Sequence, residues 1–164
     1  MNQTEIERKW LMEGFPDLPC QEELLQVQGY LSFAPVTVRI RRTQRGAVEN
    51  FCLTIKGRGG LARTEVELPM QKEQYEALMG LVQGATATKR MRLCSLPDGY
   101  VAECSLVDEG EPGSFSYAEV EFESEEEAMA FVPPACFGRE VTEEPGHTMA
   151  AYCQRKSQKV PDSL

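Results

Sequence analysis

Apolar and polar residues alternate along much of the chain. Successive side chains of a β-strand point to opposite faces, so this alternation predicts strands with one apolar and one polar face. In residues 37–43, for example, Val38 and Ile40 share one face and Arg39 and Arg41 share the other. Glycine- and proline-containing turns separate the alternating runs. The pattern predicts eight strands, over residues 4–11, 27–33, 37–43, 49–57, 63–68, 87–95, 100–107 and 115–123.

Helical spacing is confined to a few segments. Tyr75, Leu78, Met79 and Val82 recur at intervals of three and four, which predicts an amphipathic helix over residues 71–82. The sequence S-E-E-E at 124–127 is a capping-box pattern that opens a second helix, which ends before the prolines at 133–134. The remaining predictions are a helix over 148–158, a short helical segment at 22–26 and a frayed tail at about 159–164.

The composition is that of one acidic globular domain. With 164 residues, 41% hydrophobic and 26% charged, the chain can bury a substantial core, and we expect a single domain over residues 1–164. A net charge of −9 argues against a general nucleic-acid or membrane-surface binder. The sequence shows no signal peptide and no apolar run that could cross a membrane, so a cytoplasmic location is expected.

The cysteines give no sign of a metal site. None of the six forms C-x-x-C, and no Cys/His spacing is typical of zinc. Reduced thiols are the expectation for a cytoplasmic protein. Cys52, Cys94 and Cys104 fall in strand-like runs and are expected to be packing residues.

Charged residues are sorted by sign on the polar strand faces. Like charges two residues apart on a strand repel, so something of opposite sign must lie between them. A sheet that closes with its charged faces inward would set acidic strands opposite basic strands around a polar lumen. A solvated strand face is the alternative for any one strand taken alone. The cation pairs are Arg39/Arg41 and Arg90/Arg92, and the anion pairs are Glu5/Glu7, Glu65/Glu67 and Glu119/Glu121.

Such a lumen has consequences for ligands and for the outer surface. Buried charges need water, counter-ions or a ligand. The basic residues suit a polyanion with several phosphates, and the carboxylates suit Mg²⁺ or Mn²⁺. The apolar faces would then point outward, where the predicted helices cover only part of them. We therefore expect a homodimer that covers more of this surface.

The residues of the first strand resemble a family signature. E-I-E-R-K at 5–9 resembles the E-x-E-x-K motif of the CYTH superfamily, the triphosphate tunnel metalloenzymes. Order and spacing resemble the short bacterial members close to inorganic tripolyphosphatases. The resemblance implies an α+β fold in which an eight-stranded antiparallel β-barrel, closed and charged inside, carries helices outside and binds a linear triphosphate with a divalent metal. Further matching segments are Q-G-Y-L at 28–31, V-R-I-R at 38–41, L-T-I-K at 53–56, T-E-V-E at 64–67, A-E-V-E at 118–121 and E-V-T at 140–142.

The resemblance also implies roles for individual side chains. Tyr30 and Lys56 match a Tyr–Lys pair associated with triphosphate hydrolysis, and Lys9 or Lys56 with a lowered pKa could act as a base. Glu65, Glu67 and Glu103 would position water, a second metal or the basic side chains. The implied metal ligands are Glu5, Glu7, Glu119 and Glu121, and the implied phosphate-binding residues are Lys9, Arg39, Arg41, Lys56, Arg90 and Arg92.

Three departures from the family pattern bear on these roles. Where the family often has K-x-R-Y, residues 89–93 read K-R-M-R-L, so either Arg90/Arg92 or Lys89/Met91 points inward. We expect Arg90 and Arg92 to point inward, because Met91 in the same position could not bind a phosphate. Ser105 replaces a family aspartate, for which Asp108 or a water could compensate. His147-Thr148-Met149 replaces a Tyr-x-Asn segment, and His147 is expected to start a helix rather than to catalyse.

The leading hypothesis is metal-dependent hydrolysis of inorganic tripolyphosphate to pyrophosphate and phosphate. Thiamine-triphosphatase and class IV adenylate cyclase are alternatives on the same scaffold. A non-catalytic polyphosphate- or nucleotide-binding module is the alternative from another class, motivated by Ser105 and the altered C-terminal segment.

Overall fold

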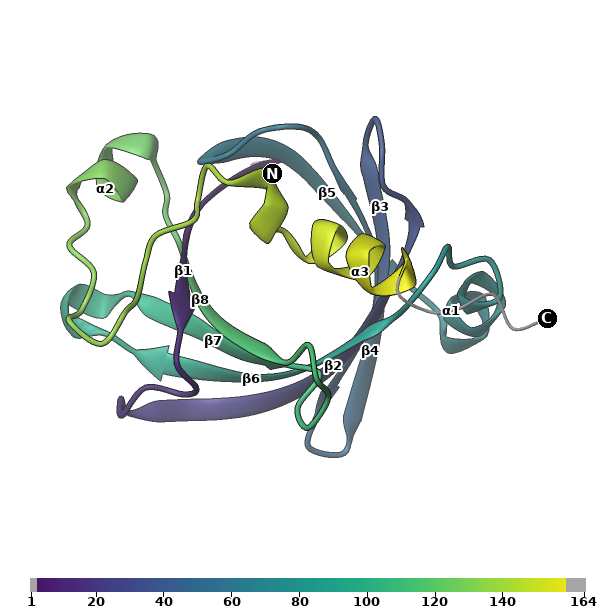
Figure 1. The fold of residues 1–164 in the computed structure, drawn as a ribbon, viewed down its shortest axis with the longest axis horizontal. Coiled ribbons are helices and arrows are strands. Elements are labelled where there is room, and N and C mark those ends of the chain that lie inside the picture. Colours follow the sequence, from purple (N-terminus) through teal and green to yellow (C-terminus); the bar gives the residue numbers. More distant parts are fainter. Residues whose placement is uncertain (1–2, 159–164) are drawn as a thin grey trace.

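The strands close into one antiparallel barrel. The computed structural model describes residues 3–158, and within them eight strands follow one another around the barrel in the order β1-β5-β4-β3-β2-β6-β7-β8 (Figure 1). The prediction of a closed eight-stranded barrel is confirmed. The strands are β1 (Thr4–Met12), β2 (Cys20–Ser32), β3 (Thr37–Arg45), β4 (Val48–Lys56), β5 (Ala62–Met70), β6 (Ala87–Ser95), β7 (Val101–Val107) and β8 (Phe115–Glu121).

The helices pack outside the barrel wall or across its end. Helix α1 (Lys72–Met79) begins with a capping box formed by Gln71 and Gln74. Helix α2 (Glu125–Ala130) begins at Ser124, whose hydroxyl accepts a hydrogen bond from the Glu127 amide at 3.1 Å. Helix α3 (Met149–Gln158) ends the described part, so the predicted frayed tail lies outside the described residues. None of these described helices has the length and apolar character needed to cross a membrane.

The predicted helical segment at 22–26 is wrong, because these residues belong to β2. The thirteen-residue β2 pairs with β6 along its first part and with β3 along its second part. Residues 22–26 all pair with β6, and Leu25 and Gln26 also pair with β3. These pairings require the extended conformation, so tertiary context overrides the local helical tendency.

The outer wall is covered unevenly. Trp10 on β1 packs against Phe131 and Phe137, with ring centroids 5.7 and 5.1 Å away, so the segment after β8 buries the wall formed by β1, β8 and β7. By contrast, Ile55 on β4 and Leu68 on β5 remain 36% and 50% exposed. Helices therefore cover only part of the apolar outer surface, as expected.

Helix α3 lies across one mouth of the barrel (Figure 1). Its buried residues Met149, Tyr152 and Cys153 pack against lumen-end residues that include Tyr30 and Tyr117. This packing closes that mouth with an apolar layer and leaves the charged part of the lumen beneath it.

Asp108 fastens α3 in this position. One carboxylate oxygen of Asp108 accepts a hydrogen bond from the Thr88 amide at 2.9 Å, and the other accepts from Lys156 Nζ at 2.9 Å and from the Tyr152 hydroxyl. These bonds occupy Asp108 outside the charged lumen. The suggestion that Asp108 compensates for Ser105 as a lumen carboxylate is therefore wrong.

Candidate active site

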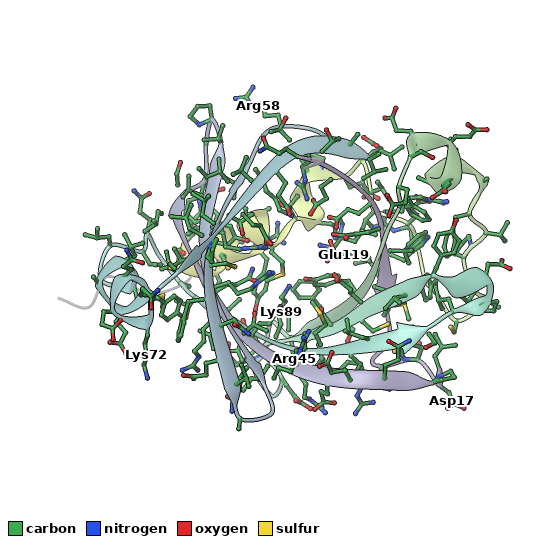
Figure 2. All side chains as sticks on the ribbon, turned by 180° about the vertical axis from the view of Figure 1, so that it is seen from behind. Asp17, Arg45, Arg58, Lys72, Lys89 and Glu119 are labelled. Atoms are coloured by element: carbon green, nitrogen blue, oxygen red, sulfur yellow. The ribbon has the colours of Figure 1, made fainter. Side chains whose placement is uncertain are left out.

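A cavity of about 660 Å³ fills the barrel and receives side chains from all eight strands. Alternation along each strand brings the charged faces inward, as Lys89 and Glu119 illustrate within the ring of strands, whereas Asp17, Arg58 and Lys72 lie at the periphery (Figure 2). Of the residues assigned roles from the sequence, those around the cavity are Glu5, Glu7, Lys9, Tyr30, Arg39, Arg41, Lys56, Glu65, Glu67, Glu103, Glu119 and Glu121.

Three carboxylates gather on one side of the cavity. Carboxylate oxygens of Glu5, Glu7 and Glu121 lie within 4.8 Å of one another, and Glu7 and Glu121 are cross-strand partners on β1 and β8. Burial and then neighbouring carboxylates raise the pKa of Glu7 well above its ordinary value, and the pKa values of Glu5 and Glu121 are also raised. A crowded, partly desolvated set of oxygen donors of this kind fits a hard divalent cation, which would relieve the repulsion.

Glu119 shares a side-chain hydrogen bond with Glu7 of this triad but has a different environment. Burial raises its pKa, but the charges of Lys9 and Lys89 outweigh burial and bring the pKa of Glu119 down to about 2. Its cross-strand neighbour Glu103 shows the opposite balance, because burial and the charges of Glu119 and Glu121 raise its pKa to about 7. Of these two adjacent carboxyl groups, the one on β8 therefore loses its proton at a much lower pH than the one on β7.

Arginine side chains face the carboxylates from β3. The Nη2 atom of Arg39 donates to the Thr54 hydroxyl at 3.1 Å, and Arg41 Nη2 lies 3.4 Å from Glu67. The Nε atoms of both arginines are buried and have no hydrogen-bond acceptor among residues 3–158. Buried guanidinium donors without acceptors are costly, so the basic side of the cavity is suited to an anion that supplies them.

Lys56 and Arg63 bridge the basic and acidic sides. Lys56 Nζ lies 3.0 Å from carboxylate oxygens of Glu5 and of Glu65. Arg63 lies 3.2 Å from Glu5 and 3.3 Å from Glu7. No role was assigned to Arg63 from the sequence, although Arg63 precedes Glu65 by two residues and so shares the inward face of β5.

The expected lowered pKa is found for Lys9 but not for Lys56. Burial lowers the pKa of Lys9. Burial also acts to lower the pKa of Lys56, but the charges of Glu7 and Glu5 act against it and the pKa of Lys56 is raised. A raised pKa keeps Lys56 protonated, which suits an electrostatic partner of phosphate better than a base.

Tyr30 and Lys56 line the same cavity without bonding to each other. Among the described residues, the Tyr30 hydroxyl accepts from Gln28 at 3.2 Å, and Lys56 bonds to carboxylates. Burial raises the pKa of Tyr30, which keeps its hydroxyl protonated. A joint role for the pair stays a prediction.

The structure corrects the orientation of β6. Lys89, Met91 and Leu93 line the cavity, so Arg90 and Arg92 point outward and the expectation that they face the lumen is wrong. Arg92 Nε lies 2.8 Å from Glu23, Arg90 Nη2 lies 2.6 Å from Glu109, and both guanidinium groups stack near Phe15 on the outer surface. The other register considered from the sequence, the one with Lys89 and Met91 inside, is the one that the structure has.

Met91 and Ser105, two of the departures from the family pattern, are direct cross-strand partners on β6 and β7. Met91 is 4% exposed and Ser105 is 1% exposed, so both are buried in the lumen wall. Relative to the family pattern, Met91 removes a positive charge and Ser105 removes a negative charge at directly opposed positions. The net charge of this part of the wall is therefore unchanged.

Lys89 and Tyr117 form a contact that the sequence analysis missed. Lys89 Nζ donates to the Tyr117 hydroxyl at 2.9 Å, and Lys9 Nζ lies 4.0 Å from the centroid of the Tyr117 ring. Tyr117 precedes Glu119 and Glu121 by two and four residues, so the alternation on β8 already placed it on the inward face.

The segment before α3 borders the cavity. Lys9 Nζ donates to the backbone carbonyl of His147 at 2.7 Å, and Glu143 accepts from the Leu61 amide at 2.9 Å. His147 lies in the short 3₁₀ turn Pro145–His147 directly before α3, with its ring near Glu144 and Arg139. The backbone here, rather than the imidazole, contacts the buried lysine.

Comparisons with known proteins agree with this geometry. No protein-family model matches the chain. An inorganic triphosphatase of Nitrosomonas europaea is 39% identical over 141 residues, which cover 86% of this chain and 91% of the relative. The crystal structure of the inorganic triphosphatase NE1496 aligns with a TM-score of 0.63 and 33% identity over 91% of this chain and 93% of that one.

A more distant structure shares the fold. HpAC1 from Hippeastrum, reported to have a dominant triphosphatase activity, aligns with a TM-score of 0.57 and 16% identity over 77% of this chain and 83% of that one. At this identity the likeness concerns the barrel alone.

Proposed function

The chain belongs to the inorganic triphosphatases of the CYTH superfamily, and on that premise we propose that its barrel hydrolyses inorganic tripolyphosphate to pyrophosphate and phosphate. The observation that carries the proposal is the pair of buried guanidinium Nε atoms of Arg39 and Arg41, which lack acceptors and lie in the cavity that also holds the carboxylate triad. A linear polyanion supplies the missing acceptors, and a cation on the opposite side would balance its charge.

Five basic residues of the lumen would bind the phosphate chain. Arg39 and Arg41 present forked donors that match phosphate oxygens, and Lys9 and Lys89 approach from the β1 and β6 sides. Lys56, held between Glu5 and Glu65, would add its positive charge to this group. The charge that develops on the leaving phosphate is stabilised by these fixed cations rather than by mobile solvent.

Glu5, Glu7 and Glu121 would hold the divalent cation. Hard oxygen donors favour Mg²⁺ or Mn²⁺, which when bound neutralises phosphate oxygens and acidifies a coordinated water. Three of the four carboxylates assigned to the metal from the sequence make up the triad. Glu119, which stays ionised between Lys9 and Lys89, would orient these two lysines toward the substrate.

Proton transfer can be served by groups that titrate near neutrality. The pKa of Lys89 is lowered to about 7, chiefly by burial, and that of Glu103 is raised to about 7 by burial. Each can exchange a proton with water in the lumen at neutral pH. Glu65 and Glu67 instead contact Lys56, Arg39 and Arg41 and would hold these cations in place.

The test is phosphate release from tripolyphosphate, ATP and thiamine triphosphate in parallel, with and without Mg²⁺ or Mn²⁺. The proposal expects metal-dependent release, fastest with tripolyphosphate, lost in Glu5→Ala and retained in Glu23→Ala, whose carboxylate lies on the outer surface. Faster release from thiamine triphosphate, or cyclic AMP from ATP, would assign a different reaction to the same lumen. Binding of tripolyphosphate without release would assign a binding module.

We further propose that a homodimer covers the exposed apolar faces of β4 and β5, where Ile55 and Leu68 lie. Light scattering of the wild type and of Leu68→Glu tests this: a monomer in both would refute it. A cytoplasmic location stays a prediction.

A further inference from the structure

Two cysteines face each other across the seam between β2 and β6. Cys20 and Cys94 are direct partners in the antiparallel register of these strands. Side chains of direct partners point to the same side of a sheet. Leu93 lines the cavity, so Cys94 points to the outer side of the barrel, away from the charged lumen. The register shifts between Cys20 and Glu22, and Cys20 lies on the same outer side, near Cys94 and the outward-facing Arg92.

The hydrogen bonding around this pair brings the two residues close together. The Ser95 amide donates to the Pro19 carbonyl at 2.9 Å, so the bond is made by the residues flanking the pair rather than by the cysteines themselves. In such a non-hydrogen-bonded pair the Cα atoms lie about 4.5 Å apart and the side chains are at their closest. A disulfide spans Cα separations of roughly 4.4–6.8 Å, so a pair of residues at this spacing is compatible with one.

The two thiols differ in access to solvent. Cys20 is exposed, whereas Cys94 is 1% exposed in the cluster that also contains Cys104. Burial raises the pKa of the Cys94 thiol, and the nearby Cys20 adds to this effect. An oxidant from solvent therefore meets Cys20 first, and Cys94 is placed to react with it second.

The neighbouring cysteines favour a two-thiol reaction over metal binding. Cys104 and Cys136 both influence the Cys94 thiol, so four cysteines share this part of the wall. Within residues 3–158, however, no three cysteine sulfurs lie within 4.8 Å of one another, as a preformed zinc site would require.

We propose that Cys20 and Cys94 form a reversible disulfide by exchange with a small-molecule disulfide such as oxidised glutathione. The Cys20 thiolate attacks one sulfur of the small disulfide, forming a mixed disulfide and releasing one thiolate. The Cys94 thiolate then attacks the Cys20 sulfur and releases the second small thiolate. Two protein thiols are oxidised, one small disulfide is reduced to two thiols, and the protein's two protons pass to the leaving thiolates. The bond fastens the start of β2 to β6 beside Leu24 and Leu93, which line the cavity.

The experiment treats the reduced full chain with oxidised glutathione, blocks free thiols with iodoacetamide and maps the peptides by mass spectrometry. Wild type is expected to lose two hydrogens in mass and to yield a peptide pair linking Cys20 and Cys94, which dithiothreitol separates. Cys94→Ser is expected to stop at the first step, with glutathione retained on Cys20.

Matched variants make the outcome decisive. Cys136→Ser removes another exposed cysteine that lies near Cys94 and should leave the Cys20–Cys94 link intact. Cys20→Ser removes an exposed side chain, so folding is not at risk, and it should abolish the link. The proposal is overturned if glutathione remains attached to Cys20 in wild type, or if the link formed joins Cys94 to Cys104 or Cys136.

Discussion

The ammonium group of Lys89 donates a hydrogen bond to the hydroxyl of Tyr117 at 2.9 Å inside the barrel. Both side chains are buried, and Lys9 lies over the face of the same aromatic ring. The hydroxyl oxygen orients Lys89 without neutralising it, unlike the carboxylates that hold Lys56 and Arg63. Tyr117 thus positions two lysines while leaving their charge available to a phosphate chain.

Tyr117→Phe is expected to weaken substrate binding more than turnover. The substitution keeps the ring beneath Lys9 but removes the oxygen that orients Lys89. A lost hydrogen bond to a charged group is worth roughly 1.5 kcal/mol, so KM for tripolyphosphate should rise about tenfold while kcat changes less. Steady-state kinetics on Tyr117→Phe, with Tyr152→Phe as a control outside the charged lumen, measures the split. An unchanged KM would remove Tyr117 from substrate positioning.

Binding of tripolyphosphate is expected to take up a proton above pH 7. Burial, together with the charges of Arg41 and Arg39, lowers the pKa of Lys89 to about 7 against the opposing charge of Glu119. At pH 8 most Lys89 is therefore neutral in the free protein, and a bound polyanion favours the ammonium form. Affinity should fall with rising pH, by up to about tenfold per unit between pH 7 and the ordinary lysine pKa.

The measurement for Lys89 is the dissociation constant of tripolyphosphate from pH 6.5 to 9 without divalent metal. Lys89→Arg keeps a permanent cation, so the part of the fall in affinity with pH that comes from Lys89 should disappear in this variant. Titration of tripolyphosphate itself affects the affinities of both proteins equally. Identical pH profiles for wild type and Lys89→Arg would contradict the assignment.

The corrected face of β6 predicts a contrast between two arginines. Arg41 lies in the lumen with a buried Nε that lacks an acceptor, whereas Arg92 pairs with Glu23 on the outer surface. Arg41→Ala should raise KM by roughly 10- to 100-fold, the worth of one or two charge-assisted hydrogen bonds. Arg92→Ala should stay within about twofold of wild type. Similar losses in both variants would mean that the outward placement of Arg92 does not hold in solution.

Period-two alternation predicted the strands and the two faces of each, whereas the closed eight-stranded barrel was implied by the resemblance to the CYTH superfamily. Each strand with an unbroken alternation, such as the one that carries Glu5, Glu7 and Lys9, fixes its own inward face once the sheet is closed. The error at β6 arose because residues 89–92 offer cations on both faces, so the choice depended on chemistry rather than on the pattern. Alternation separates Lys89 and Met91 from Arg90 and Arg92 but does not say which of the two faces is inward.

Other features had no local signal. The distance between carboxylates on β1 and β8 depends on their register, so the sequence could not show that Glu121 joins Glu5 and Glu7 while Glu119 lies between lysines. The strand at 22–26 forms because β6 pairs with all of it and β3 pairs with its last two residues, a tertiary cause that local propensity does not contain. Asp108 can fasten α3 only because this helix folds back over one mouth of the barrel, which the sequence near Asp108 does not indicate.

Asp108→Asn is expected to loosen α3. Burial raises the pKa of Asp108, but hydrogen bonds from Thr88, Tyr152 and Lys156 outweigh it, so the pKa is lowered in the folded protein. The stabilisation is therefore complete above the ordinary carboxyl pKa of about 4 and is lost as pH falls through the lower, folded-state value. The variant should be less stable by about 1–3 kcal/mol at pH 7.

Urea unfolding at pH 7 and near pH 3 tests this prediction for Asp108. The gap between wild type and Asp108→Asn should narrow at the lower pH, where the wild-type carboxylate becomes protonated. Asp98→Asn, a change in the exposed turn Pro97–Gly99, serves as the matched control and should show no such gap. A gap of equal size at both pH values would rule out the ionised carboxylate as the cause.

The contact between Met91 and Ser105 predicts that charges can be restored there only as a pair. Met91→Arg alone would bury a guanidinium on the same face of β6 as Lys89, with no carboxylate at the directly opposed position of β7, and should destabilise the protein by about 3 kcal/mol. Adding Ser105→Asp places a carboxylate on the directly opposed position of β7 and should recover about 1–3 kcal/mol as coupling. A double-mutant cycle of unfolding free energies measures this coupling, and tripolyphosphate affinity should be higher in the double variant than in Ser105→Asp alone, because the new arginine adds a phosphate donor. Additive free energies would show that the two positions do not interact, and the paired departures from the family pattern would then need separate explanations.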